Sequence, residues 1–297
     1  GMTDFIAEVC SNHNGSHPRA LSLIDTAADI GCIGVKFQLF RLDKLYTPEA
    51  LNHPDYRQML QERRAWELPL EWLPTLANHC RQRGIKFGCT PFYLEAVDLL
   101  QSYVDFFKIA SYNLLDTNLL AKVAQTGKPI MLSTGMATVA EISDAVKILD
   151  SCPSVALLHC VSTYPAPLTE CQPLAIRYLY RYMVGHPLWR VGWSDHTVKP
   201  GAIYHFTLTL DVRVVEFHLD LDRKGNEYGL GHCWLPEEMG PVIEAVKDAM
   251  SVMAEQPTGD PSTSSGHGFS ATEEKERLWR ADAGDGLRPV REARNTL

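Results

Sequence analysis

The feature that most constrains the fold is an alternation between short apolar runs and longer amphipathic stretches, which repeats eight times. The short runs are rich in β-branched and aromatic residues. Most are almost continuously apolar, as in parallel strands covered on both faces. They predict strands at Asp4–Val9, Ile33–Gln38, Ile85–Cys89, Val104–Ile109, Pro129–Ser133, Val155–Cys160, Trp189–Trp193 and Val212–His218.

The stretches between these strands carry apolar residues at helical spacing. Thr138 and Glu141 have the spacing of a capping box at the start of one of them. Repeated βα units predict an α/β fold, a (β/α)8 TIM barrel, with a doubly wound open sheet as the alternative. The predicted helices are Pro18–Ile30, Leu70–Gln82, Leu94–Ser102, Asp116–Gln125, Val139–Leu149, Gly201–Thr209 and Pro236–Ala254.

Two long interruptions and a change of composition organise the rest of the chain. Residues 41–67 and 162–187 break the repeat, and long βα loops usually shape a pocket. Residues 257–270 are rich in Gly, Ser, Thr and Pro, which is typical of a flexible linker. We therefore expect a single-domain barrel over residues 2–255, and a linker with a partly ordered C-terminal tail over 256–297. A short helix is possible at Glu273–Trp279.

The charge balance bears on partners. The chain has 28 basic and 36 acidic residues, a net charge of −8, and no basic block. This argues against nucleic acid or an anionic membrane as a partner, and leaves a small anionic substrate open. The eight cysteines form no C-x-x-C pair and no apolar run is long enough to span a bilayer. We expect reduced thiols in a cytoplasmic protein.

Polar and ionisable residues gather where the predicted strands end. In a barrel these carboxyl ends form one rim, and barrel active sites occupy that rim. The residues concerned are Glu8, Lys36, Gln38, Thr90, Lys108, Ser111, Ser133, Thr134, His159, Ser162, Tyr164, Ser194, Asp195, His196, Glu216 and His218.

Lys36 and Lys108 are the first candidates for chemistry, because an unpaired ammonium at the end of an apolar strand is costly. Together with the strand-end hydroxyls they predict a bowl that binds phosphate and carboxylate. A second interpretation is that each lysine neutralises a nearby carboxylate such as Glu8. A third makes one lysine a Schiff-base nucleophile with a depressed pKa.

His196 and His218 end neighbouring strands and predict a pair of ligands for a divalent metal ion. The alternative is one core histidine and one general base. Asp195 and Glu216 are candidates to orient the imidazoles by accepting hydrogen bonds from them. Strand alternation also allows Glu216 to share the face of His218 instead.

Nine short motifs follow one another between about residue 5 and residue 225. They are Glu8 with Asn12-His13-Asn14-Gly15, Gly34-Val35-Lys36-Phe37-Gln38, Thr90-Pro91-Phe92, Phe107-Lys108-Ile109-Ala110-Ser111, Gly127-Lys128-Pro129, Leu132-Ser133-Thr134-Gly135-Met136, His159-Cys160-Val161-Ser162 with Tyr164-Pro165, Ser194-Asp195-His196-Thr197, and Glu216-Phe217-His218 with Asp222-Arg223. In this order they resemble the sialic acid synthase (N-acetylneuraminate synthase) family, which includes the spore-coat polysaccharide, pseudaminate and legionaminate synthases.

The resemblance implies a transferase that condenses phosphoenolpyruvate with an N-acylhexosamine, such as N-acetylmannosamine or its 6-phosphate. The products would be a nine-carbon 2-keto sugar acid and phosphate. It implies a Mn²⁺ or Mg²⁺ cofactor, held by His196 and His218, and a homodimer. It places Lys36, Thr90, Lys108, Ser111, Ser133 and Ser194 on phosphoenolpyruvate, and Glu8, Gln38 and Tyr164 on the sugar or the attacking water, with Glu8 as general base.

The sequence also departs from the family pattern. Asn113 stands where the family usually has Glu, and Lys224-Gly225-Asn226-Glu227-Tyr228 replaces a Gly-Pro-Asp-like stretch, with Glu227 as the stand-in. We assign Asn113 and Glu227 to substrate binding. We expect no antifreeze-like C-terminal domain of the kind that many members carry. The alternative functions are a Schiff-base pyruvate aldolase or lyase, and a non-catalytic barrel that binds an anion or a metal.

Overall fold

The computed structural model describes residues 1–254 and 276–294. Parallel strands β1 to β8 lie side by side in sequence order, and β1 also pairs with β8, so that the sheet closes into a barrel. The short strand β9 (Cys233–Trp234) extends the sheet beside the end of β8. The barrel strands are β1 (Asp4–Glu8), β2 (Gly34–Leu39), β3 (Lys86–Pro91), β4 (Phe106–Ile109), β5 (Ile130–Ser133), β6 (Val155–His159), β7 (Arg190–Asp195) and β8 (Val214–Leu219).

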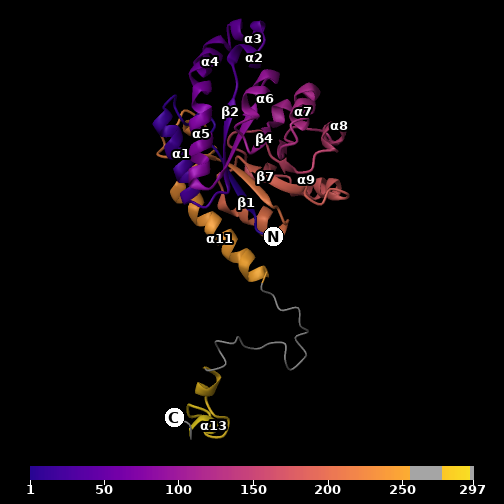
Figure 1. Cartoon of the computed structure of the whole chain (residues 1–297). Helices are drawn as coiled ribbons and strands as arrows, with labels where there is room; N and C mark the ends of the chain where they lie inside the picture. The colour runs from indigo at the N-terminus through magenta and orange to yellow at the C-terminus, as the bar shows by residue number, and fades with distance from the viewer. Residues whose placement is uncertain (255–275, 295–297) are drawn as a thin grey trace. The chain divides into compact units, whose positions relative to one another are not determined.

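The helices surround this barrel (Figure 1). The described α-helices are α1 (His17–Asp29), α2 (Leu42–Leu45), α3 (Pro48–Asn52), α4 (Arg57–Glu62), α5 (Leu73–Arg83), α6 (Leu94–Leu100), α7 (Thr117–Ala124), α8 (Val139–Leu149), α9 (Pro173–Leu179), α10 (Pro200–Tyr204), α11 (Pro236–Ala254) and α13 (Arg291–Arg294). Short 3-10 turns lie at Arg63–Trp66, Leu70–Trp72, Ser111–Asn113, Leu168–Glu170, Tyr180–Met183, Tyr228–Leu230 and Arg277–Trp279, and a π-helical turn follows α10 at His205–Thr209.

The predicted TIM barrel is confirmed, and the open-sheet alternative is wrong because β1 closes on β8. The predicted capping box also forms: the Thr138 hydroxyl accepts from the Glu141 amide, and the Glu141 carboxylate accepts from the Thr138 amide. The two interruptions contain helices that the sequence pattern did not predict. Residues 41–67 hold α2, α3 and α4, and residues 162–187 hold α9, the helix of the sixth βα unit.

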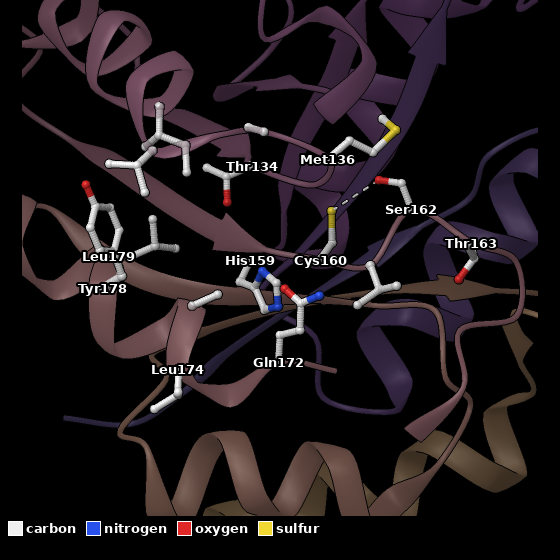
Figure 2. Close-up of a pocket in the computed structure, with 15 residues that line it drawn as sticks. Thr134, Met136, His159, Cys160, Ser162, Thr163, Gln172, Leu174, Tyr178 and Leu179 are labelled. Atoms are coloured by element: carbon white, nitrogen blue, oxygen red, sulfur yellow. Dashed lines mark hydrogen bonds between the residues drawn. The ribbon is translucent and has the colours of Figure 1, made fainter. Parts of the chain in front are cut away.

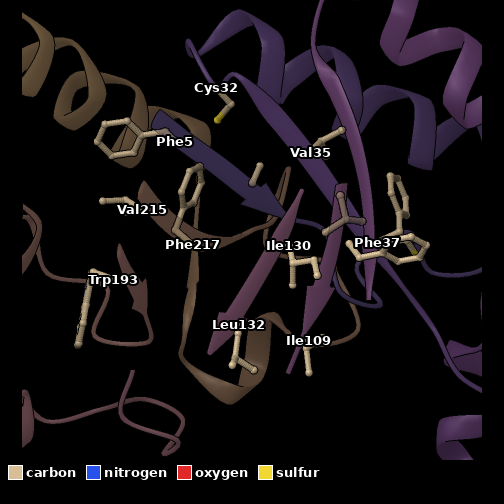
Figure 3. Close-up of a cluster of buried hydrophobic side chains, with 14 of the residues drawn as sticks. Phe5, Cys32, Val35, Phe37, Ile109, Ile130, Leu132, Trp193, Val215 and Phe217 are labelled. Atoms are coloured by element: carbon tan, nitrogen blue, oxygen red, sulfur yellow. The ribbon is translucent and has the colours of Figure 1, made fainter. Parts of the chain in front are cut away.

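Two apolar layers form because successive strand side chains point to opposite faces of the sheet. The larger layer lies between strands and helices, and Figure 3 draws part of it, including Phe5, Trp193 and Phe217. The smaller layer plugs the inside of the barrel and consists of Ile6, Phe106, Met131, Ala156, Leu158 and Val214. This inner plug closes the amino-terminal side of the barrel interior and leaves the carboxyl ends of the strands free for a polar site.

The inner plug depends on a glycine. A Cβ atom at Gly88 would lie 2.2 Å from the ring of Phe106, and one at Gly34 would lie 3.0 Å from Ile6. The register pairs Gly88 with Phe106, so the ring lies over a position without a side chain. The large ring can therefore fill the centre of the barrel at this level.

Residues Val252–Leu297 form a second compact unit. Within its described part, Arg294 forms two hydrogen bonds to the Asp285 carboxylate, at 2.5 and 2.8 Å, and the Asp282 carboxylate accepts from the Arg291 amide. The predicted linker at residues 257–270 and the start of the predicted helix at Glu273–Trp279 lie outside the described residues.

All eight cysteines are buried, free thiols. Among the helices within residues 1–254 and 276–294, none is both long and apolar enough to cross a membrane.

Candidate active site

The site lies directly above the inner plug. Ile6, Phe106, Met131 and Val214 belong to the plug, and the residue two positions further along each strand is polar. Because alternate residues share a face, these polar side chains also point into the barrel, one layer nearer the carboxyl ends. One pocket brings together Glu8, Lys36, Gln38, Thr90, Lys108, Ser111, Ser133, Tyr164, Ser194, His196, Glu216 and His218. The predicted convergence of the two lysines and the two histidines on one rim is confirmed.

Two lysines and two carboxylates form the floor of the pocket. Lys36 and Glu8 are register partners on neighbouring strands, and their charged groups are in direct contact. Across the barrel, Lys108 Nζ lies 3.1 Å from Glu216 Oε1, and Lys36 Nζ lies 3.8 Å from Glu216 Oε2. Each lysine thus neutralises a carboxylate, the second of the three interpretations, and the four formal charges cancel.

Burial and these partners shift the pKa values of the quartet. Burial lowers the pKa of Lys36 to about 7, against the opposing effect of Glu216. Burial would raise the pKa of Glu216, but Lys108 and Lys36 beside it lower it to about 2. Glu216 is therefore ionised at neutral pH.

The hydroxyl groups in the pocket fall into two classes. Ser194 Oγ donates to Glu216 Oε1 at 2.8 Å, and Ser111 Oγ lies 3.0 Å from Ser162 Oγ. Thr90 Oγ1 and Ser133 Oγ are buried and have no hydrogen-bond partner among the described residues. Buried hydroxyls are rarely left unpaired. These two are therefore donors available to a ligand that enters the pocket.

Three imidazoles meet at one side of the pocket. The ring centroids of His196 and His218 are 5.2 Å apart, and that of His232 lies 4.5 Å from His218. His196 Nδ1 is 2.6 Å from the Val161 carbonyl oxygen, so this nitrogen donates and Nε2 keeps its lone pair. His218 Nδ1 is buried without a partner among the described residues.

The charge state of these rings suits metal binding. Burial lowers the pKa of His196, and it lowers the pKa of His218 well below its usual value with help from His232. Burial also lowers the pKa of His232 to about 4. Neutral imidazoles with free lone pairs are the form that binds divalent ions. His196 and His218 therefore fit the expected metal pair.

The expectation that Asp195 and Glu216 orient the imidazoles is wrong. Asp195 accepts hydrogen bonds from the indoles of Trp193 and Trp234 and from the Thr197 hydroxyl, at 3.0, 2.9 and 2.7 Å. Glu216 binds lysine and serine, as described above. Glu216 and His218 are two residues apart on one strand and share the inner face, as the alternative allowed.

Two residues assigned to the substrate do not line the pocket. Asn113 lies in the 3-10 turn Ser111–Asn113 beside the rim. Glu227 Oε2 accepts from the backbone amide and the hydroxyl of Ser11, at 2.6 and 2.7 Å. The Glu227 carboxylate is held there with its side chain 14% exposed.

His159 belongs to a neighbouring pocket between the β5–α8 and β6–α9 connections (Figure 2). Its ring hydrogen-bonds with the Cys171 carbonyl at 2.8 Å, and burial lowers its pKa. Cys160 and Ser162, which contact each other at 3.8 Å, line this second pocket, and Cys160 also lines the active-site pocket. The two pockets are therefore adjacent.

Five residues at the site were not predicted from the sequence. Phe92, Ala110, Tyr112 and Cys160 line the pocket, and His232 packs against His218. Phe92, Ala110 and Cys160 lie within the motifs quoted above, and Tyr112 directly follows one of them. His232 gave no signal, because it precedes the two-residue strand β9 and reaches the site only through the pairing of β9 with β8.

Comparison with known proteins gives a family match over most of the chain. The model of the NeuB family matches residues 23–257. The N,N'-diacetyllegionaminic acid synthase of Campylobacter jejuni is 33% identical over 267 residues, which cover 85% of this chain and 78% of the relative. The spore coat polysaccharide biosynthesis protein SpsE of Bacillus subtilis is 30% identical over 254 residues, covering 82% of this chain and 66% of the relative.

A solved structure extends the likeness to three dimensions. The N-acetylneuraminic acid synthetase of Leptospira borgpetersenii superposes with a TM-score of 0.77 at 25% identity, and the match covers 93% of this chain and 90% of that one. The resemblance seen in the motifs is therefore confirmed over most of the barrel. From the family match and these relatives, the chain belongs to the NeuB family.

Proposed function

We propose that this protein condenses phosphoenolpyruvate with an N-acylhexosamine to give a nine-carbon 2-keto sugar acid and inorganic phosphate. Three relatives are named as synthases of legionaminic, pseudaminic and N-acetylneuraminic-9-phosphate type acids. The observation that carries the proposal is the pocket, where two lysines, two unpartnered hydroxyls and a pair of neutral imidazoles meet.

Phosphoenolpyruvate binding follows from the donors on the pocket floor. Thr90 Oγ1 and Ser133 Oγ donate to its oxygens. The ammonium groups of Lys36 and Lys108 leave their carboxylate partners in the protein and pair with the anionic groups of the ligand. The free floor is neutral, so an incoming anion is repelled by Glu8 and Glu216 as well as attracted by the lysines. A further positive charge near the floor of the pocket would therefore favour binding of phosphoenolpyruvate.

His196 and His218 would hold a Mn²⁺ or Mg²⁺ ion, which would supply a Lewis acid that polarises the aldehyde of the open-chain sugar. A carbon–carbon bond forms between the enol carbon and the aldehyde carbon, and the aldehyde oxygen takes up one proton to become a hydroxyl. Water then adds to the cationic carbon that still carries the phosphate oxygen. The C–O bond to phosphate breaks, the remaining proton of the added water is lost, and the keto group forms. Glu8 takes the proton of the water.

The contacts of Glu8 suggest when it becomes a base. In the free protein its carboxylate contacts Lys36 and accepts from the Cys10 amide at 2.7 Å. An ammonium partner lowers the basicity of a carboxylate. When Lys36 turns to the phosphoryl group, Glu8 loses this partner and its proton affinity rises.

The two unpartnered hydroxyls give a sharp test. Thr90→Val removes a hydroxyl that has no hydrogen-bond partner within residues 1–254 and 276–294, so we expect unchanged or slightly higher stability together with about a tenfold rise in the KM for phosphoenolpyruvate. Phosphate release is measured with Mn²⁺ and a panel of N-acylhexosamines. Thr207→Val is the matched control: its hydroxyl donates to the Ile203 carbonyl at 2.7 Å, so stability falls while KM stays.

Absence of phosphate release with every acceptor in the panel would contradict the synthase assignment. An unchanged KM in the Thr90→Val variant would contradict the assigned phosphoenolpyruvate subsite while leaving the reaction itself standing.

A Schiff-base reaction is the second candidate, because the pKa of Lys36 is lowered to about 7 by burial. Contact with Glu8 opposes it, since a carboxylate neighbour keeps the amine protonated. Borohydride reduction in the presence of pyruvate decides between the two. The synthase leaves the protein mass unchanged, whereas a Schiff base adds a reduced pyruvate adduct to Lys36.

A further inference from the structure

Cys10 and Glu227 bring two further metal-binding atoms close to His218. The thiol sulfur, one imidazole nitrogen and one carboxylate oxygen lie within 4.8 Å of one another. Cys10 is 2% exposed and His218 is 7% exposed. The residues come from the end of β1, from β8 and from the loop before β9, so the barrel closure assembles the group.

The backbone at Cys10 is unusual for the residue it carries. Its φ is +48°, in the left-handed region that favours glycine. A residue with a Cβ atom is strained there. The thiol is nevertheless buried beside Cys233 and Glu227, which together with burial raise its pKa well above the usual value. A strained residue at a site is a reason to look for a function.

Glu227 is positioned by the loop that follows Cys10. Both hydrogen bonds from Ser11 fall on its Oε2, and Oε1 lies 3.9 Å from His232 Nε2. The remaining oxygen is therefore directed toward the imidazoles.

Unpartnered imidazole nitrogens give the second, independent observation. His218 Nδ1 and both ring nitrogens of His232 are buried with no hydrogen-bond partner among the described residues. His232 is 1% exposed, and its ring centroid is 4.5 Å from that of His218. Nitrogens buried in this way need a partner, and the part of the chain that the structure describes supplies none.

We propose that Cys10, His218 and Glu227 form a site for a thiophilic divalent ion of the Zn²⁺ class, with His232 as the nearest further donor. Sulfur, nitrogen and oxygen ligands at bonds of roughly 2.0 to 2.3 Å suit Zn²⁺, whereas a thiolate sulfur is a poor ligand for Mg²⁺ and Mn²⁺. The three atoms have to approach by about 1 Å to reach such bonds. Binding breaks the S–H bond of Cys10, forms the metal–sulfur bond and releases one proton to solvent.

The site shares His218 with the pair His196 and His218. The two ions therefore compete for one imidazole, and Zn²⁺ inhibits the Mn²⁺-loaded synthase. Only this inhibitory consequence rests on the proposed function, because binding at Cys10 is measured without substrate.

Co²⁺ titration of the full chain tests the site. A thiolate ligand produces an intense near-ultraviolet charge-transfer band, which imidazole and carboxylate ligands do not. We expect this band in the unmodified protein, and its displacement by Zn²⁺. Cys10→Gly removes the thiol at a position whose φ favours glycine, so the variant folds. We expect it to lose the band and to bind Co²⁺ at least about 100-fold more weakly, because losing even a supporting group costs about 10- to 100-fold.

Cys233→Ser is the matched control, since it removes the adjacent thiol and leaves the three ligands. Retention of the band in this variant and its loss in Cys10→Gly supports the site. A band that survives Cys10→Gly, or no band in the unmodified protein, overturns the proposal. These outcomes are independent of any activity measurement, so a failed synthase assay and a failed metal site are distinguishable.

Discussion

Lys108 and Glu216 face each other across the barrel, although they are 108 residues apart in the sequence. Their contact places a full charge of each sign in a buried layer of the barrel. Removing one partner of such a pair usually costs more than the pair contributes, because the other charge stays buried. The floor of the pocket is thus a coupled unit in which no member can be changed alone without consequence.

Lys108→Met tests this coupling. We expect a loss of about 3 to 5 kcal/mol in the free energy of unfolding, because the Glu216 carboxylate then keeps only Ser194 and the more distant Lys36. Adding Glu216→Gln restores part of that loss, since the buried charge is gone. Denaturant unfolding of both single variants and the double variant measures the interaction.

Lys147→Met is the control for Lys108→Met, because Lys147 pairs with Asp144 at 3.0 Å on an exposed helix face. We expect a change within about 0.5 kcal/mol. Equal losses at positions 108 and 147 would contradict the account of the pocket floor.

At the same scale, the sequence predicted which residues reach the rim, because strand ends and period-2 alternation can be read from apolar runs. Apart from Glu8 as a candidate partner of a lysine, it did not predict which of these side chains pair with each other. The Glu216–Lys108 contact crosses from β8 to β4, and only the closed barrel sets that distance. The approach of His232 and the left-handed backbone at Cys10 likewise depend on loop geometry, which leaves no periodic signal.

Among the elements, β3 and β4 carry the tightest fit. The ring of Phe106 occupies the space that a Cβ atom at Gly88 would fill. Overpacking of this kind forces neighbouring side chains or backbone to move, and typically costs 1 to 3 kcal/mol. The inner plug therefore restricts which residues β3 accepts.

Gly88→Ala is expected to lower the free energy of unfolding by about 2 to 3 kcal/mol, because the new methyl group meets the Phe106 ring. Thermal or denaturant unfolding measures the loss. Gly201→Ala in α10 is the control: no atom lies within 4 Å of its Cβ position, and alanine favours helix by about 1 kcal/mol. A Gly88→Ala variant as stable as the control would contradict the plug.

Helices and strands with a regular apolar pattern could be predicted from the sequence, and short or irregular ones could not. The predicted helix Val139–Leu149 matches α8 at both ends, because a capping residue and an apolar stripe mark it. Helix α9 follows Gln172, which has a φ of +48°, inside an irregular loop. The helix spans only seven residues, which is too short for a helical period of apolar residues to be recognised. The two residues of β9 are too few for any alternation to appear.

On the scale of the whole molecule, buried neutral histidines make stability depend on pH. Burial lowers the pKa of His13 and of His232 to about 4, from an unfolded value near 6.5. Between these values the unfolded chain binds more protons than the folded one. The free energy of unfolding therefore falls as the pH falls from about 6.5 to about 4, by roughly 3 kcal/mol for each histidine.

This dependence is checked by measuring the unfolding midpoint in a chelating buffer at a series of pH values from about 7.5 to about 4.5. This range covers most of the interval between the unfolded and folded pKa values of the two histidines. His13→Asn keeps an acceptor for the Gly15 amide, which donates to His13 Nδ1 at 3.0 Å, and should flatten the slope by about half of the two-histidine contribution. A slope that is flat in the unmodified protein would contradict the neutral state of these rings.

The pairing of β1 with β8 has a practical consequence for shortened versions of the protein. Asp4 pairs in register with Val214, and the Thr3 hydroxyl donates to the Val212 carbonyl at 2.8 Å. Deleting the first eight residues would turn a ring into an open ribbon, with unsatisfied amides and carbonyls along β2 and β8. Such exposed margins recruit strands from other molecules. We therefore expect a protein shortened at this end to form insoluble aggregates, and not to remain folded with slightly lower activity.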